Sequence, residues 1–213
     1  MDFERLLETV GTEPVFETGL LLAGDVDPND VRRQLTRWTQ NGRIYQLRRG
    51  VYALAPPHQK VKPHPFLVAN RLVRGSTVSL QSALAHCGLI PEYVATVTSV
   101  TSGRPGDFST PIGDYRFRHI KPALIFGYRR LDVGKEQTAY IAVPEKALLD
   151  LVHLQPGGDS VEYLKSLRLQ NLSQLSPRAL AEMAARAASP KLTRAATVIA
   201  ELARSEAEEY AAV

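Results

Sequence analysis

Apolar residues at the start of the chain recur at helical intervals. In the segment DFERLLETVG, residues 2–11, an apolar side chain appears every three or four positions, so we predict a short first helix. The segment FETGLLLAG, residues 16–24, predicts a second helix with Thr18 as its N-cap and Gly24 at its C-terminal end. Two short amphipathic helices therefore open the chain.

The third predicted helix has clear signals at both ends. Asp27 is in the N-cap position, Pro28 follows in the first turn, and Gly42 lies beyond the last turn. Its apolar side chains share one face and should pack on the first two helices: Val31, Leu35 and Trp38. The other face carries long donors and one small hydroxyl: Arg32, Arg33, Thr36, Arg37 and Gln40.

A β-hairpin is predicted directly after the third helix. The runs RIYQL (43–47) and VYAL (51–54) are rich in strand-forming residues and flank the turn residues RRG. Three helices followed by a hairpin is the element order of a winged helix-turn-helix. The next segment is rich in proline and lysine without apolar periodicity, so we predict a winged helix-turn-helix domain over 1–56 and a linker over 57–65.

Residues 66–213 mix strand and helix patterns. Glycine-centred turns between extended runs predict a mainly antiparallel sheet, and the hydroxyl-rich run TVTSVTS suits an edge strand. Helix starts at Ser160, Ser176–Pro177 and Ser189–Pro190 predict a helical C-terminal end. The predicted fold class is α+β, with an N-terminal winged helix-turn-helix domain followed by a mixed α+β domain over 66–213.

Charge is distributed unevenly along the chain, although the net charge is only +4. Residues 1–30 hold one arginine and eight carboxylates, whereas residues 31–91 hold ten lysines and arginines and no carboxylate. A solvated basic face would explain a short run of this kind. Over some sixty residues that include a helix and a hairpin, a polyanion partner is the better interpretation.

The third helix and the hairpin could together bind double-stranded DNA. The major groove accommodates one α-helix, and the candidates for base contacts are Asn29, Arg32, Arg33, Thr36, Arg37 and Gln40. The candidates for phosphate or minor-groove contacts are Arg43, Arg48 and Arg49, although the last two could simply be hydrophilic turn residues. Asp27 and Asp30 would oppose DNA unless they face the first two helices.

No catalytic constellation is evident, so we expect no enzyme, no cofactor and no metal. The P-loop, GxSxG and HExxH motifs are missing from the sequence, and the single cysteine allows no internal disulfide. His58 and His64 lack zinc-ligand spacing, and Asp150 and His153 are expected to form a surface or capping pair. The apolar runs are too short for a membrane span, and the start lacks a signal-peptide layout, so we expect a cytoplasmic protein. A repressor with a strongly basic hairpin can bind repeated sites as a monomer, so we also expect a monomer in solution.

Four segments, in order, resemble the AbiEi family of antitoxins and transcriptional regulators of type IV toxin-antitoxin systems. They are RRQLTRWTQNGRIYQLRRGVYAL, VSLQSALAHCGLIPE, FRHIKPALIFGY and VPEKALLDLVHL, within residues 15–155. The resemblance implies an N-terminal winged helix that binds operator DNA upstream of its own operon, with cooperative binding left open. It also implies a C-terminal domain that counters a nucleotidyltransferase-type toxin, directly or indirectly, through residues that cannot be assigned from this sequence.

Two alternatives to an antitoxin remain open. One is a ligand-sensing winged-helix regulator without a toxin partner. The other is a DNA-acting enzyme that uses the winged helix for targeting, although its metal-binding carboxylates are candidates by residue type only.

Overall fold

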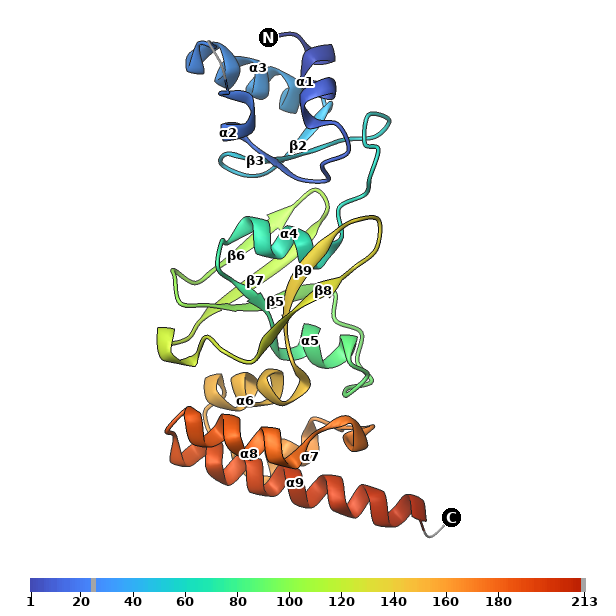
Figure 1. Cartoon of the computed structure of the whole chain (residues 1–213), viewed down its shortest axis with the longest axis vertical. Coiled ribbons are helices and arrows are strands. Elements are labelled where there is room, and N and C mark those ends of the chain that lie inside the picture. Colours follow the sequence, from blue (N-terminus) through green and yellow to red (C-terminus); the bar gives the residue numbers. More distant parts are fainter. Residues whose placement is uncertain (24–25, 212–213) are drawn as a thin grey trace.

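The computed structural model describes residues 1–23 and 26–211 as an elongated molecule in three tiers (Figure 1). The N-terminal helices and hairpin form the first tier, a six-stranded sheet with two helices forms the second, and a group of helices forms the third. The protein therefore has a mixed α+β fold, as the sequence predicts. Across the described residues, none of the helices has both the length and the apolar character needed to cross a bilayer.

The N-terminal tier contains the predicted helices and hairpin together with one short strand. Its elements are α1 (Phe3–Val10), β1 (Phe16–Glu17), α2 (Thr18–Leu21), α3 (Pro28–Gln40), β2 (Ile44–Arg48) and β3 (Val51–Leu54). The strands form an antiparallel sheet in the order β1-β3-β2. Glu17, rather than the predicted Thr18, occupies the N-cap position of α2, and the predicted end of that helix at Gly24 lies outside the described residues.

The second tier is built around a mixed sheet in the order β6-β7-β5-β4-β9-β8. Its elements are α4 (Pro65–Leu72), β4 (Thr77–Val78), α5 (Leu80–His86), β5 (Thr96–Thr101), β6 (Gly106–Thr110), β7 (Gly113–His119), η1 (Pro122–Leu124), β8 (Tyr128–Asp132) and β9 (Thr138–Ala142). The pairings β6–β7 and β8–β9 are antiparallel, as the glycine turns predict, and β4–β5 is antiparallel too, while β5–β7 and β4–β9 are parallel. β7 runs parallel to β5 because the antiparallel strand β6 comes between them in the chain.

The hydroxyl-rich strand β5 is interior, so its assignment as an edge strand was wrong. It lies between β7 and β4, and hydrogen bonds to neighbouring elements satisfy much of its polarity. The Thr98 hydroxyl donates to the Ser79 carbonyl (2.8 Å) and accepts from the Ser82 amide (3.0 Å). A buried hydroxyl is tolerated in a sheet interior when it finds such partners, and sequence alone does not identify them.

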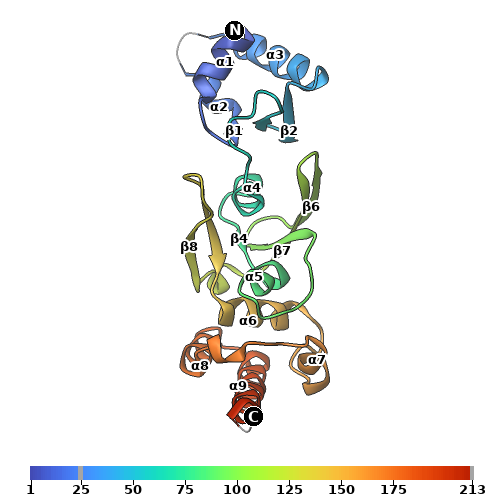
Figure 2. The ribbon, with the colours of Figure 1, turned by 90° about the vertical axis from the view of Figure 1, so that its right-hand side faces the viewer.

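The third tier packs under the sheet through α6 (Pro144–Leu154). It continues with α7 (Val161–Ser166), η2 (Leu172–Gln174), α8 (Pro177–Arg186) and α9 (Pro190–Ala211). The helices α7, α8 and α9 begin where the serine and proline signals predict. Figures 1 and 2 show α6 between the sheet and the last two helices. Buried apolar residues from all these elements belong to the same core cluster as the sheet.

The hairpin β2–β3 contributes buried residues to both the N-terminal core and the core of the sheet. Ile44 and Leu54 pack with α1–α3 in the N-terminal core, whereas Leu47 and Val51 belong to the core cluster of the sheet. All four residues of β3 are buried. The hairpin thus joins the first two tiers instead of projecting freely into solvent.

The segment predicted as a linker, 57–65, is held against the sheet by hydrogen bonds. The Gln137 side chain accepts from the His64 amide (2.8 Å) and donates to the Lys62 carbonyl (3.0 Å). The His64 ring caps α4, because its Nδ1 accepts from the Phe66 amide at 3.1 Å. The segment therefore lacks apolar periodicity because it is an irregular connection, and hydrogen bonds hold it in place.

Asp150 does not form the predicted surface or capping pair with His153. It is 2% exposed and bonds to the Lys146 ammonium and to the Ser79 hydroxyl, the latter at 2.8 Å. Burial raises the pKa of the Asp150 carboxyl, and the neighbouring Lys146 and Ser79 act in the opposite direction. The three-residue spacing of Asp150 and His153 gave a wrong prediction because the partner Ser79 lies in a distant part of the chain.

Candidate nucleic-acid interface

Helix α3 is fixed in the N-terminal tier by its cap and by its apolar stripe. The Asp27 carboxylate accepts a hydrogen bond from the Asn29 amide (2.9 Å), and Pro28 occupies the first turn. On the inner face, Val31, Leu35 and Trp38 are buried in the N-terminal core. The ends and the orientation of the helix are therefore determined by the local signals present in the sequence.

The structure places the predicted base-contacting residues together on the outer side of α3. All six side chains are exposed: Asn29, Arg32, Arg33, Thr36, Arg37 and Gln40. Their side chains make few local hydrogen bonds. Arg32 Nη1 donates to the Asn29 carboxamide oxygen (3.4 Å), Arg33 Nη2 donates to the Asp30 carboxylate (3.4 Å), and the Thr36 hydroxyl donates to the Arg32 carbonyl (2.9 Å). Most guanidinium donors on this face remain available to a partner.

The carboxylate of Asp30 is neutralised within the N-terminal tier. The Met1 ammonium lies 3.0 Å from one carboxylate oxygen, and Arg33 lies 3.4 Å from the other. The hydrogen bond from the Met1 ammonium lowers the pKa of Asp30. Burial acts in the opposite direction, while the positive charges of that ammonium and of Arg33 lower the pKa further. Asp30 therefore adds little repulsion towards a polyanion at the start of α3.

Arg43 joins the α3 face through its contact with α1. Its guanidinium lies over the Phe3 ring, 4.7 Å from the ring centroid, which holds it by a cation–π contact. A hollow of about 450 Å³ between α1 and α3 is lined by both Arg37 and Arg43. Two cations from different elements thus share one concave surface, a common arrangement for binding phosphate.

The two hairpin arginines lie in different environments. Arg49 is exposed in the turn, whereas Arg48 is partly buried and its Nε has no hydrogen-bond partner among the described residues. The Thr18 amide donates to the Gly50 carbonyl (3.0 Å), which holds the turn beside the start of α2. Arg49 is therefore free to contact phosphate, while Arg48 is constrained by packing against its surroundings.

A second basic surface lies where α4 meets the β8–β9 hairpin, and the sequence patterns did not identify it. A hollow of about 440 Å³ is lined there by Arg71, Arg74, Tyr128 and Tyr140, with Arg74 paired to Glu17. The two exposed tyrosine rings lie 6.1 Å apart. Their proximity depends on the pairing of β8 with β9, so only the absence of acids over 31–91 gave any sign of this surface.

The histidines considered as metal ligands have structural contacts. His58 packs edge-on against the Phe3 ring at 4.8 Å, and burial lowers the pKa of His64, the cap of α4. In the part of the chain that the structure describes, three or more histidine, cysteine, aspartate or glutamate side chains nowhere gather as a metal site would require. The donors that sequence analysis considered are not brought together.

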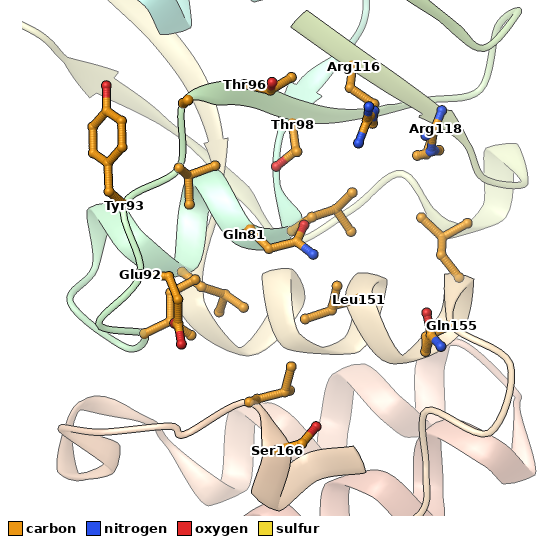
Figure 3. A pocket seen from close by; sticks show the side chains of 17 residues that line it. Gln81, Glu92, Tyr93, Thr96, Thr98, Arg116, Arg118, Leu151, Gln155 and Ser166 are labelled. Carbon is orange, nitrogen blue, oxygen red and sulfur yellow. The ribbon is translucent and has the colours of Figure 1, made fainter.

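One cavity lies far from α3, on the side of the sheet that faces α6 and α7 (Figure 3). It has a volume of about 650 Å³. Arg116 and Arg118 extend into it from β7, while Leu151 and Gln155 of α6 lie opposite them (Figure 3). The molecule therefore offers an exposed basic helix at one end and a concave, partly apolar site in its middle.

Comparison with known proteins identifies the fold and leaves the family open. The sequence matches no family model, and no curated protein matches it significantly. The crystal structure of the RV2827C protein from Mycobacterium tuberculosis is similar, with a TM-score of 0.54 and 20% sequence identity. The match covers 92% of this chain and 75% of that chain. At this identity the similarity demonstrates a shared α+β fold alone.

Proposed function

We propose that the chain is a DNA-binding transcriptional repressor that acts as the antitoxin of an AbiE-like type IV toxin-antitoxin system. In this proposal residues 1–56 form a winged helix-turn-helix domain, 57–65 connect it, and 66–213 form the antitoxin domain. The protein works in the cytoplasm on operator DNA upstream of its own operon. The ordered sequence segments that resemble the AbiEi family support the antitoxin role.

The observation that carries the DNA-binding proposal is the outer face of α3. It presents Arg32, Arg33 and Arg37 to solvent, and the only carboxylate paired with any of them, among the described residues, is Asp30, which the Met1 ammonium also neutralises. An exposed helix with this composition has the dimensions and the donors that major-groove recognition requires. Arg43 shares a hollow with Arg37 of α3, and Arg49 is a further exposed cation in the hairpin turn.

A gel-shift experiment with the chain's own upstream DNA tests the proposal. The logarithm of the affinity should fall linearly with the logarithm of the salt concentration, because phosphate contacts release counterions. Replacing Arg33 and Arg37 by Ala should weaken specific binding about tenfold or more and relax sequence preference. The matched control is Arg178→Ala/Arg194→Ala, which removes two exposed arginines from α8 and α9. Equal binding by both variants, or no binding by the wild type at low salt, would disprove DNA recognition through α3.

Co-expression tests the antitoxin role separately from DNA binding. The chain should relieve the growth arrest caused by the product of the adjacent gene, whereas a regulator without a toxin partner should not. Rescue by the Arg33→Ala/Arg37→Ala variant would place neutralisation outside α3. Failure of the wild-type chain to rescue would reject the antitoxin role and leave a DNA-binding regulator.

The cavity beneath the sheet favours one second candidate, a ligand-sensing transcriptional regulator. Its volume of about 650 Å³ falls within the range of small-molecule sites, roughly 300–1,000 Å³. In this alternative the N-terminal tier still binds DNA, and a small molecule replaces the toxin as the regulatory partner.

A further inference from the structure

We infer that the cavity beneath the sheet binds a small amphiphilic anion, a molecule with an apolar body and a carboxylate or similar head group. The cavity is formed by β5, β7, α5, α6 and α7, together with the loop that follows α5 (Figure 3). Five structural elements thus converge on one concave surface. The regulatory meaning of this site rests on the second candidate function, whereas its ability to bind a ligand does not.

The floor of the cavity is apolar. It is formed by side chains that are buried or nearly so and come from α5, the loop after it, and α6: Leu80, Leu84, Ile90, Leu151 and Leu154. Apolar surface that lines a concave site gains about 25 cal/mol for each Å² that a ligand removes from water. An aliphatic or aromatic body would therefore be retained there.

The wall above this floor is cationic. Arg116 and Arg118 are two residues apart on β7, so both point to the same face of the sheet, and Figure 3 shows both side chains directed into the cavity. Each guanidinium makes one contact of 3.3 Å with a single shared carboxylate, that of Asp107. Two arginines thus share one acid among the described residues and retain donors for a second, anionic partner.

The opposite end of the cavity has different chemistry, which gives the ligand an orientation. Glu92 and Tyr93 lie at that end (Figure 3), and the Tyr93 side chain is 91% exposed. A negative head group would be repelled by Glu92 and attracted by the arginines. We therefore place the head group beneath Arg116 and Arg118 and the apolar body over the leucines.

One residue of the floor is held in a strained backbone conformation. Leu80 has a φ of 58°, in the left-handed region that leucine rarely adopts, at the turn from β4 into α5. Such strain, of order 1–3 kcal/mol, persists only where the surrounding structure enforces it, and it is frequent at ligand sites. The preceding residue, Ser79, is fixed by its hydrogen bond to the buried Asp150. The buried network therefore holds a residue of the cavity floor in place.

Binding of two anionic amphiphiles and one cationic amphiphile to the purified full chain tests the inference. 8-Anilinonaphthalene-1-sulfonate, which has aromatic rings and a sulfonate, should bind saturably at one site, monitored by its fluorescence. Decanoate should displace it, and decyltrimethylammonium, with the same tail and a positive head, should be at least tenfold weaker. Absence of saturable binding, or equal competition by decanoate and decyltrimethylammonium, would overturn the inference.

Two variants locate the site. Arg116→Gln/Arg118→Gln should weaken decanoate binding at least tenfold, whereas the charge-matched control Arg178→Gln/Arg194→Gln should leave it unchanged. Ser166→Trp places a large ring on the exposed side of α7 at the cavity and should block both probes. Thermal unfolding followed by circular dichroism verifies that each variant is folded. If the two double variants bind decanoate equally and Ser166→Trp blocks neither probe, the ligand does not bind in this cavity. The measurement contains no DNA, so its failure is distinct from failure of the proposed repressor.

Discussion

Helices α3 and α6 both begin with proline, but the arginine side chains of α3 are exposed and the charged side chains of α6 are buried. Each has proline in its first turn, and each carries charged residues three or four positions apart. In α3 the arginines face solvent, whereas in α6 the side chains of Glu145, Lys146 and Asp150 are buried. The spacing of charges therefore determines which residues can meet, and the tertiary environment determines whether they face water or the core.

The two environments give the charges different energetic consequences. An exposed ion pair such as Arg33–Asp30 contributes little, about 0–1 kcal/mol, because water and salt screen it. A buried charge requires a partner, since an unpaired one loses its hydration without compensation. The α3 arginines are available for binding, whereas Lys146 and Asp150 form a buried ion pair with each other.

The largest expected effect comes from removing one member of the buried pair. Asp150→Ala leaves the Lys146 ammonium, only 3% exposed, without its carboxylate, and it also removes the acceptor of the Ser79 hydroxyl. We expect the free energy of unfolding to fall by about 3–5 kcal/mol. Urea denaturation followed by circular dichroism measures this change.

Two further variants distinguish a lost charge partner from a lost volume. Glu182→Ala removes the carboxylate of an exposed pair on α8 and should change stability by less than about 0.5 kcal/mol. Lys146→Met/Asp150→Leu removes both charges and should recover much of the stability lost in Asp150→Ala. If Asp150→Ala and Glu182→Ala are equally stable, the contrast between the two helices is incorrect.

The sequence predicted α3 and its outer face because their signals are local. The cap, the proline and the apolar stripe lie within fifteen residues, and helical geometry alone brings the arginines together. Asp150 was assigned incorrectly because its partner Ser79 is 71 residues away and meets it only after the sheet has formed. The proximity of Tyr128 and Tyr140 likewise depends on strand register, which local patterns do not specify.

Arg48 and Arg49 allow the same comparison between adjacent residues. Arg48→Ala should lower the free energy of unfolding by about 1 kcal/mol, because its partly buried stem packs against its surroundings. Arg48→Met retains the stem and removes an Nε that lacks a partner among the described residues, so stability should be equal to or above that of the wild type. Arg49→Ala should leave stability unchanged and weaken binding to all DNA sequences. Urea denaturation and gel shifts measure the two effects, and a loss of stability in Arg49→Ala would contradict the assignment.

The smallest effect concerns the cap of α4. Burial, with a further contribution from His86, lowers the pKa of His64, so the unfolded chain binds more protons than the folded chain as the pH falls below about 6.5. The stabilisation is therefore complete above that pH and is lost as the pH falls through the folded pKa. His64→Asn retains a capping acceptor that does not titrate, and between pH 7 and 5 it should lose less stability than the wild type. The difference should be about 1 kcal/mol or less, the size of one capping hydrogen bond, measured by urea denaturation at each pH.

The control for this prediction is His119→Asn, at an exposed position on β7. Parallel pH profiles for the wild type and His64→Asn would contradict this prediction. They would show that protonating His64, which removes the acceptor of the Phe66 amide, does not lower the free energy of unfolding.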